Sequence, residues 1–211
     1  MEINDTTPTT GKREARKQDR RQAIIEAARQ SFLEAGYAAT SMSGLLKTLG
    51  GSKATLWGYF RSKEELFAAV VEDLTVTFLQ ELERDLALTG ALEPTLTRFC
   101  RRFMESLSGP EALATWRLVV AESGRFPEVG RIFFEQAPRR LQSALRHYLA
   151  HKINLGELRD EDPGKMAEML ASLCASQHTR MLWGGSDIDL ADIHQRSQEY
   201  TAYFLRAFRA E

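Results

Sequence analysis

The sequence lacks the features of disulfide-rich secreted proteins and of membrane proteins. Only two of its 211 residues are cysteines, Cys100 and Cys174, which cannot form a disulfide framework and do not have the spacing of a metal-binding pair. The longest purely apolar run covers residues 66–71, whereas a membrane span needs about 20 apolar residues. Residues 1–11 are polar and have no apolar stretch like that of a signal peptide. We therefore expect a reduced, cytoplasmic protein.

Neither sign of charge dominates the chain as a whole. It has 28 Lys and Arg against 29 Asp and Glu, so its bulk charge would not draw it to nucleic acid. The two parts of the chain differ, however. Residues 1–63 contain eleven basic and six acidic residues, whereas residues 64–211 contain seventeen and twenty-three. A basic region on an acidic remainder suggests that the first part faces a nucleic acid.

Strand patterns are missing as well, since no stretch alternates between apolar and polar residues and no hairpin turn is evident. Apolar residues instead recur at helical spacing, and 43% of the chain is hydrophobic, which is enough for a sizeable core. We predict an all-α fold of about nine helices, in which Pro138 kinks or splits the seventh. The predicted helices cover residues 20–35, 40–48, 52–58, 62–88, 93–107, 110–123, 127–154, 163–183 and 189–208.

The chain divides into three parts by composition and pattern. Residues 1–17 are predicted to be a flexible basic tail, residues 18–71 a three-helix domain, and residues 72–211 a second helical domain. The basic residues from Lys12 to Arg21 form a solvated helix start or an arm that reaches the backbone or minor groove of DNA. Both alternatives remain open from the sequence.

Residues 40–58 form a helix-turn-helix pattern. Two short helices flank the turn at Gly50-Gly51, and Ser52 caps the second of them. This second helix could enter a DNA major groove, where Lys53 supplies positive charge and Thr55, Trp57 and Tyr59 offer donors or apolar edges. Ser62 and Glu65 have the spacing of a capping box at the start of the fourth helix.

The region from about residue 18 to residue 71 resembles the tetracycline-repressor (TetR) family of bacterial transcription regulators, in register and without gaps. Many positions at fixed spacing support the resemblance far more strongly than a lone helix-turn-helix. The positions that carry it are Ile24, Ala27-Ala28, Phe32, Gly36-Tyr37, Thr40-Ser41-Met42, Ser52-Lys53, Thr55-Leu56-Trp57, Tyr59-Phe60 and Ser62-Lys63-Glu64-Glu65-Leu66-Phe67.

The resemblance implies a dimeric, ligand-responsive DNA-binding regulator of bacteria, expected to be a repressor of a near-palindromic operator. It implies that Thr40, Tyr59 and Lys63 hold phosphates and that Lys53, Ala54, Thr55 and Trp57 face bases, with Ser52 beside them. Trp57 could equally pack in the core, and Phe60 is expected to do so. Leu46, Gly51 and Gly58 depart from the family pattern, which affects the expected sequence preference rather than the class.

The second domain is predicted to dimerise and to bind a small, largely apolar molecule. Apolar faces on the last two helices predict a dimer interface, although the same faces would also suit the core of a single chain. The interface residues are Met166, Leu170, Met181, Ile193, Tyr200, Tyr203 and Phe204. The predicted pocket residues, which could also be core, are Phe99, Phe103, Trp116, Val120, Phe134, Met169, Leu173 and Gln177, with Glu122, His178 and Arg180 as further polar anchors.

We expect no catalytic site and no cofactor, because no nucleophile with a neighbouring base and no phosphate-binding or zinc motif is present. His147 and His151 are four residues apart on one predicted helix and could bind a metal, but no third ligand is evident. The alternative function is an all-helical ligand-binding protein or enzyme whose helix-turn-helix no longer binds DNA. A membrane-surface role is disfavoured, because the first helix lacks bulky apolar anchors.

Overall fold

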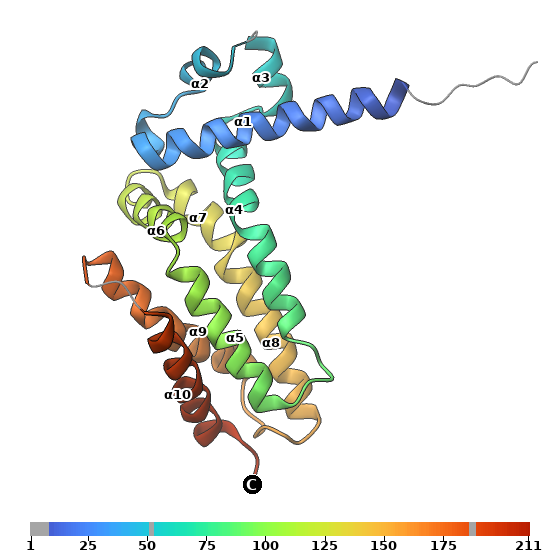
Figure 1. Ribbon diagram of the computed structural model, residues 1–211, viewed down its shortest axis with the longest axis vertical. Helices are drawn as coiled ribbons and strands as arrows, with labels where there is room; N and C mark the ends of the chain where they lie inside the picture. Colours follow the sequence, from blue (N-terminus) through green and yellow to red (C-terminus); the bar gives the residue numbers. More distant parts are fainter. Residues whose placement is uncertain (1–8, 51–52, 186–188) are drawn as a thin grey trace, which may run out of the picture. The chain divides into compact units, whose positions relative to one another are not determined.

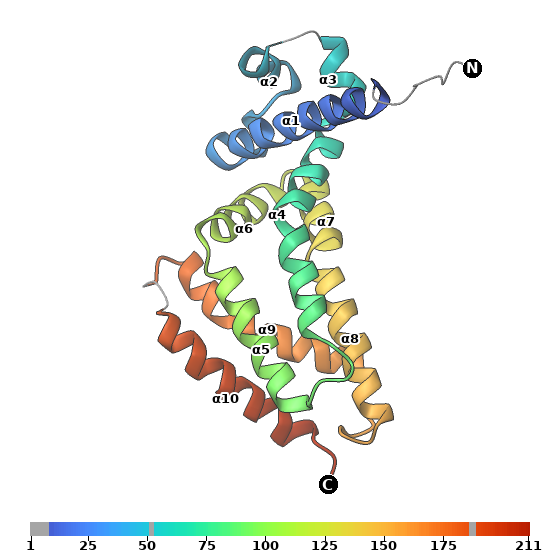
Figure 2. The ribbon, with the colours of Figure 1, turned by 45° about the vertical axis from the view of Figure 1, so that its right-hand side comes forward.

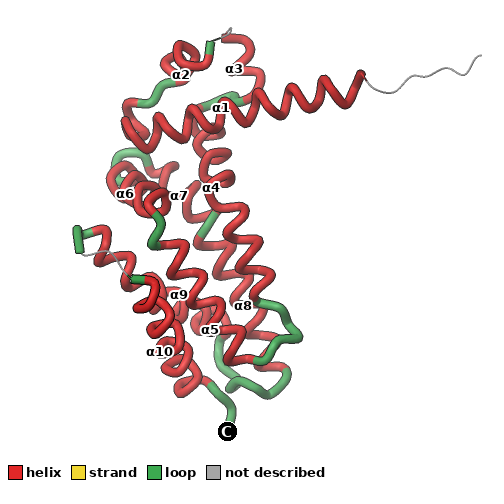
Figure 3. Tube along the Cα trace, viewed as in Figure 1, coloured by secondary structure: helices red, strands yellow, loops and turns green. Residues whose placement is uncertain are grey.

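The computed structural model describes residues 9–50, 53–185 and 189–211, and these residues form ten α-helices and no β-strand (Figure 3). The all-α prediction is confirmed, and Pro138 splits the predicted seventh helix in two. The chain divides into two compact units, Met1–Asp73 and Leu74–Glu211. We call them the head and the body and describe each by itself.

The head consists of α1 (Thr9–Ala39), α2 (Met42–Leu49), α3 (Lys53–Tyr59) and the first part of α4 (Lys63–Asp85). Three aromatic rings form the centre of its core. The rings of Phe32, Tyr37 and Phe67 contact one another with centroids 5.2–5.6 Å apart. Leu56 of α3 is buried on the same core. Both α2 and α3 lie on one side of α1 (Figure 1).

The first helix is longer than the sequence pattern predicts. It begins at Thr9, so residues 9–17, which we expected to be a flexible tail, are helical. At its other end the backbone leaves the helical region at Gly36, where φ is 86°. A residue with a Cβ would be strained there, so glycine fixes the point at which the chain turns toward α2.

Side-chain caps fix the starts of α2 and α4. The hydroxyl of Ser41 accepts a hydrogen bond from the backbone N–H of Gly44 at 3.0 Å. At α4 the hydroxyl of Ser62 accepts from the N–H of Glu65, whose carboxylate accepts from the N–H of Arg61. The predicted capping box is therefore present, with the return bond one residue earlier than in the usual motif.

The body contains the end of α4 and six further helices (Figure 2). Proline is the first residue of four of them, at positions 110, 127, 138 and 163, where its fixed φ suits a helix start and its missing N–H is not needed. The six helices are α5 (Leu92–Leu107), α6 (Pro110–Ser123), α7 (Pro127–Gln136), α8 (Pro138–Asn154), α9 (Pro163–Leu182) and α10 (Leu190–Phe208).

The fifth helix contributes the largest share of the body core. Seven of its sixteen residues are buried, and it packs against α9 and α10. In contrast, α6 buries only three residues, Thr115, Leu118 and Val119. Helices with few buried contacts open at lower free-energy cost than the core around them, so α6 is the more easily displaced of the two.

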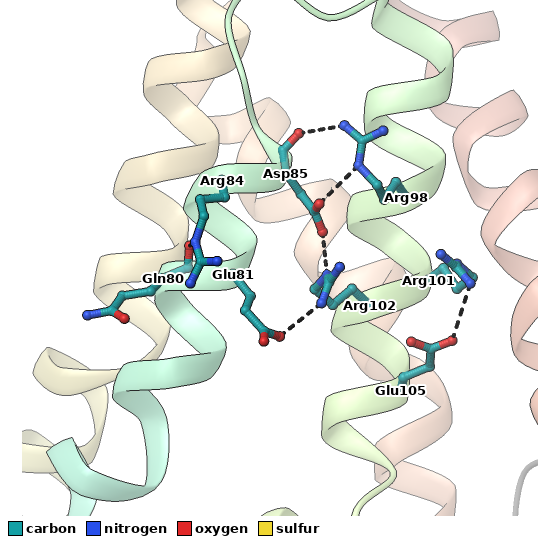
Figure 4. A network of polar contacts seen from close by, with 8 residues as sticks. All are labelled: Gln80, Glu81, Arg84, Asp85, Arg98, Arg101, Arg102 and Glu105. Carbon is teal, nitrogen blue, oxygen red and sulfur yellow. Dashed lines mark hydrogen bonds and ion pairs between the residues drawn. The ribbon is translucent and has the colours of Figure 1, made fainter.

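A charged network joins the end of α4 to α5 (Figure 4). Asp85 is almost buried, and its carboxylate accepts hydrogen bonds from Nε of Arg98 at 3.0 Å and from Nε of Arg102. Arg102 also binds Glu81 one turn earlier, at 2.9 Å. These acidic partners raise the pKa of Arg102, the hydrogen bond to Asp85 being the largest cause. The C-terminal end of α4 is thereby fixed to the body.

Candidate nucleic-acid interface

The third helix presents a polar and aromatic face to solvent. Leu56 and the adjoining Phe60 are both 1% exposed, so they attach α3 to the core, as expected for Phe60. On the other side Ala54 and Thr55 are exposed, and the side chain of Trp57 is 44% exposed. An exposed tryptophan offers a partner both a large apolar surface and an indole N–H donor. The structure therefore places Trp57 outside the core.

The remaining predicted contacts of this segment differ in what the structure shows of them. Tyr59 is half-buried at the end of α3. Gly58 is exposed and adds no side chain to the face. Lys53 is the first residue of α3, but its side chain lies outside the described part of the chain, and so does the whole of Ser52.

Thr40 is buried rather than directed outward. Its side chain is 3% exposed, and its hydroxyl donates to the carbonyl of Gly36 at 2.9 Å and lies 2.9 Å from the hydroxyl of Ser31. The hydroxyl therefore holds the turn between α1 and α2. The prediction that Thr40 itself donates to a phosphate is not supported by this geometry, because the group is already engaged inside the head.

Lys63 is also engaged within the head. Its ammonium group donates to the carbonyl oxygens of Tyr37 at 2.8 Å and of Thr40 at 3.1 Å. It also lies 4.1 Å from the ring centroid of Tyr37. Lys63 thus supplies hydrogen-bond donors to carbonyl groups that follow Gly36, which explains a lysine at a helix N-terminus where the helix dipole disfavours it. No phosphate is required to account for its position.

Two arginines of α1 likewise contact the head itself. Arg20 donates to the carbonyls of Leu49 and Gly50 at the end of α2, the latter at 2.7 Å. The guanidinium of Arg21 lies 5.3 Å from the ring centroid of Phe60. The sequence pattern did not reveal these roles, because nothing in a run of basic residues tells which of them will reach a carbonyl or a ring.

The basic residues that precede Arg20 are exposed. Arg13, Arg16 and Lys17 lie seven, four and three residues before it, so they share its face of the helix. Because the side chain of Arg20 binds carbonyls at the end of α2, this face of α1 lies on the same side as the end of α2. α1 continues past α3 along this exposed stretch (Figure 1). Lys47, in the last turn of α2, is a further exposed cation that our sequence analysis did not single out.

The predicted dimer interface of the body is largely a core face. Of its seven residues, only Tyr203 is exposed, and the others are buried within the single chain. The amphipathic pattern identified the apolar sides of the two helices correctly, but those sides pack against α5 and its neighbours. The buried residues are Met166, Leu170, Met181, Ile193, Tyr200 and Phe204.

The eight predicted pocket residues do not line one common cavity. Phe99, Phe103 and Leu173 pack in or against the core, whereas Val120, Phe134 and Met169 are exposed. Two surface hollows, of about 560 and 1050 Å³, are lined by other residues. Trp116 and Gln177 are half-buried, and Trp116 contacts a residue that we had named only as a possible anchor, His178.

The remaining candidate groups show no reactive arrangement. Cys100 and Cys174 are both buried, and the pKa of the Cys174 thiol is raised by a hydrogen bond to Cys100 and by burial, which suits packing rather than reactivity. Among the described residues, no three His, Cys, Asp or Glu side chains, His147 and His151 included, come together as metal ligands. None of the helices in the described ranges has the length and hydropathy to cross a membrane.

Comparison with known families decides the class. Residues 24–70 match the model of bacterial regulatory proteins of the tetR family, and residues 94–210 match the C-terminal domain of AefR-like transcriptional repressors. The chain belongs to the TetR family. It is a DNA-binding transcriptional regulator, as the helix-turn-helix pattern predicted. A helical protein whose head has lost DNA binding is not favoured.

Individual regulators are similar to this chain over nearly their full length. A TetR-family regulator of Mesorhizobium loti has a TM-score of 0.80 and 25% identity, covering 92% of this chain and 99% of that one. The flavonoid-responsive regulator FrrA has a TM-score of 0.78 and 32% identity, covering 91% and 98%. The regulator BetI of Rhizobium meliloti is 26% identical over 190 residues, which are 89% of this chain and 90% of that one.

Proposed function

We propose that this TetR-family regulator is a ligand-responsive repressor that binds a near-palindromic operator as a dimer. The observation that supports it is the face of α3 on which Thr55 and Trp57 are exposed to solvent, while Leu56 is buried in the core of the head. In a dimer, two such helices would enter successive major grooves. Fluorescence anisotropy with DNA from the gene's own neighbourhood tests this. Specific binding that weakens with salt is expected, and equal affinity for unrelated DNA would contradict it.

The side chains of the head divide into two roles. Lys53, Ala54, Thr55 and Trp57 face bases, and Tyr59 contacts a phosphate. Ser52 adds a contact beside them. We propose that Thr40 and Lys63 act indirectly, because their polar groups hold the turn that leads into α2. Substitutions at Lys53, Thr55 or Trp57, which face bases, should change sequence preference. Substitutions at Thr40 or Lys63 should instead weaken binding to all sequences alike.

The start of α1 adds contacts to the DNA backbone outside the groove. Arg13, Arg16 and Lys17 are exposed on the same face of α1 as Arg20, whose side chain binds the end of α2. Residues 12–17 contain four cations and one acid, Glu14, which lies 4.0 Å from Lys17, so the stretch keeps a net positive charge. A row of DNA phosphates would supply the further anions. A helix, rather than an extended arm in the minor groove, makes these contacts.

The dimer forms through the outward sides of α9 and α10. Met169 and Tyr203 are exposed on these helices, and Trp183, at the end of α9, is 81% exposed. Large apolar groups of this kind are commonly covered by a partner. Size-exclusion chromatography with light scattering tests the assignment. Trp183→Ser together with Tyr203→Ser should give monomers, and Val120→Ser together with Phe134→Ser, on α6 and α7, is the matched control.

The inducer is a largely apolar molecule bound in the body. FrrA is named as flavonoid-responsive, which supports an aromatic inducer for this chain too. Ligand binding would tilt α4, whose last turn is held to α5 by Asp85 and whose first turn contains Lys63. Differential affinity of the ligand for the two states supplies the energy of this change. A compound that binds the body should therefore weaken DNA binding by the same factor as DNA weakens compound binding.

A further inference from the structure

His178 on α9 is a buried imidazole with one of its two nitrogens engaged. Its side chain is 3% exposed, and Nδ1 lies 2.7 Å from the carbonyl oxygen of Leu107, the last residue of α5. Because a carbonyl oxygen only accepts hydrogen bonds, Nδ1 must carry the proton and donate it. The other nitrogen, Nε2, is buried and has no hydrogen-bond partner among the described residues.

The charge state of the ring follows from its surroundings. Burial lowers the pKa of His178, and the positive charge of Arg117 lowers it further, while the bond to Leu107 acts in the opposite direction. The ring is therefore neutral at pH 7, and its tautomer is set by the bond at Nδ1. Nε2 then presents a lone pair. A buried acceptor of this kind is costly to leave without a donor.

The surroundings of His178 are aromatic. Trp116 of α6 meets the imidazole edge-on with centroids 5.1 Å apart, and Phe133 of α7 meets Trp116 in the same way at 5.5 Å. Flat aromatic molecules pack well against such edges and faces. Helix α6, which carries Trp116, has the three buried residues noted above and exposes Val120 beside it, so it can move aside more easily than α5.

We propose that the body binds a hydroxylated aromatic molecule whose hydroxyl group donates a hydrogen bond to Nε2 of His178 and whose ring packs against Trp116. This inference rests on the proposed ligand response of the body and names the chemical class of the ligand. A phenol satisfies the buried acceptor, whereas its methyl ether, which has the same ring, has no proton to donate. The bound ring would displace α6 relative to α9.

Isothermal titration calorimetry on the full-length protein, without DNA, tests the proposal with 2-naphthol and 2-methoxynaphthalene as probes. The wild type should bind 2-naphthol about tenfold more tightly than the ether. His178→Asn retains an amide donor for Leu107, while its amide oxygen is bonded to Cγ and does not reach as far as Nε2 of the histidine. This preference should therefore fall to about twofold or less. His147→Asn, at an exposed position on α8, is the matched control and should retain the preference.

Nitrogen NMR of the histidine ring gives a second readout that needs no variant. Adding 2-naphthol to the wild type should move the Nε2 resonance of His178 and leave the other histidines unchanged. Equal binding of the two probes, no binding of 2-naphthol at millimolar concentration, an unmoved resonance, or a preference retained by His178→Asn would each overturn the proposal. Because DNA is absent from these measurements, such a result would leave the DNA-binding proposal standing.

Discussion

In the head, Lys63 and Arg20 bind backbone carbonyl oxygens, whereas in the body Arg98 and Arg102 both bind the carboxylate of Asp85. A carbonyl carries no net charge, so a cation bound to it keeps its full charge. A carboxylate cancels the charge of the cation that it binds. Lys63 and Arg20 thus hold parts of the head together and keep their positive charge, whereas Asp85 fixes α4 to α5 by pairing opposite charges.

The largest effect is expected from breaking the charged network of the body. Asp85→Ala leaves Arg98 and Arg102 without their shared carboxylate, and it should lower the free energy of unfolding by about 2–3 kcal/mol. Urea unfolding followed by circular dichroism measures this. The matched control is Glu105→Ala, because Glu105 and Arg101 form an exposed pair at 3.9 Å that should contribute about 0–0.5 kcal/mol. Equal effects of the two substitutions would show that the network adds no stability.

Lys63→Ala should have the next largest effect, and it should act through structure rather than through charge. Loss of two carbonyl contacts and one ring contact should destabilise the head by about 1–2 kcal/mol and weaken binding to all DNA sequences about tenfold. The slope of log K against log salt should stay nearly unchanged. Lys47→Ala, at the exposed end of α2, should instead lower that slope by about 0.9 with little change in stability. A reduced slope for Lys63→Ala would identify it as a phosphate contact.

Removing the exposed cations of α1 should have a smaller effect on affinity and a clear effect on its salt dependence. Changing Arg13, Arg16 and Lys17 together to Gln should lower the salt slope by about 2–3 without altering sequence preference. An equal loss of charge in the body, at Arg131, Arg140 and Arg146, serves as the control. The measurement is fluorescence anisotropy at several salt concentrations.

A helix-breaking variant shows whether residues 9–17 contact DNA as a helix or as a flexible arm. Gln18→Pro keeps every charge but lets the helix restart at its own position, which detaches residues 9–17. If these residues act as a helix, the salt slope should fall as far as it does for the triple Gln variant, together with a loss of helical circular dichroism. An unchanged slope would indicate that the segment reaches DNA as an arm.

The smallest expected effect is a change of stability with pH in the body. Because the pKa of His178 is lowered in the folded state, the unfolded chain takes up a proton more readily there. The stabilising contribution is complete above the ordinary histidine pKa of about 6.5, and it is lost as the pH falls below that value. The melting temperature should therefore drop between pH 7.5 and pH 5.5, and it should drop less in His178→Asn. Equal drops would assign the effect to other groups.

Local patterns in the sequence predicted most of the fold. The capping pair Ser62 and Glu65 and the break at Gly36 depend on neighbouring residues, so spacing alone located them. The roles of Thr40 and Lys63 depend on bonds to distant residues of the chain. The hydroxyl of Thr40 and the ammonium group of Lys63 can donate a hydrogen bond to a phosphate or to a buried carbonyl equally well. Sequence therefore located the helix-turn-helix but not which of its polar groups are engaged within the head.

The body shows the same limit in another form. Helical spacing identified the apolar sides of α9 and α10, but it cannot tell whether an apolar side faces its own chain or a second copy. Met166 and Phe204 lie in the core, while Met169, three residues after Met166, and Tyr203, directly before Phe204, are exposed. His178 was one of several polar candidates, and only the structure distinguishes it, through its burial, the bond from Nδ1 to Leu107 and the contact with Trp116.

The four prolines that open α6, α7, α8 and α9 have a consequence for how this regulator can evolve. Each one sets where its helix starts through a ring in the backbone itself, independently of any neighbour. Insertions or deletions in the connecting loops therefore cannot easily shift a helix along the chain. The start of each of these four helices is thus encoded in the helix itself and does not depend on the length of the loop before it.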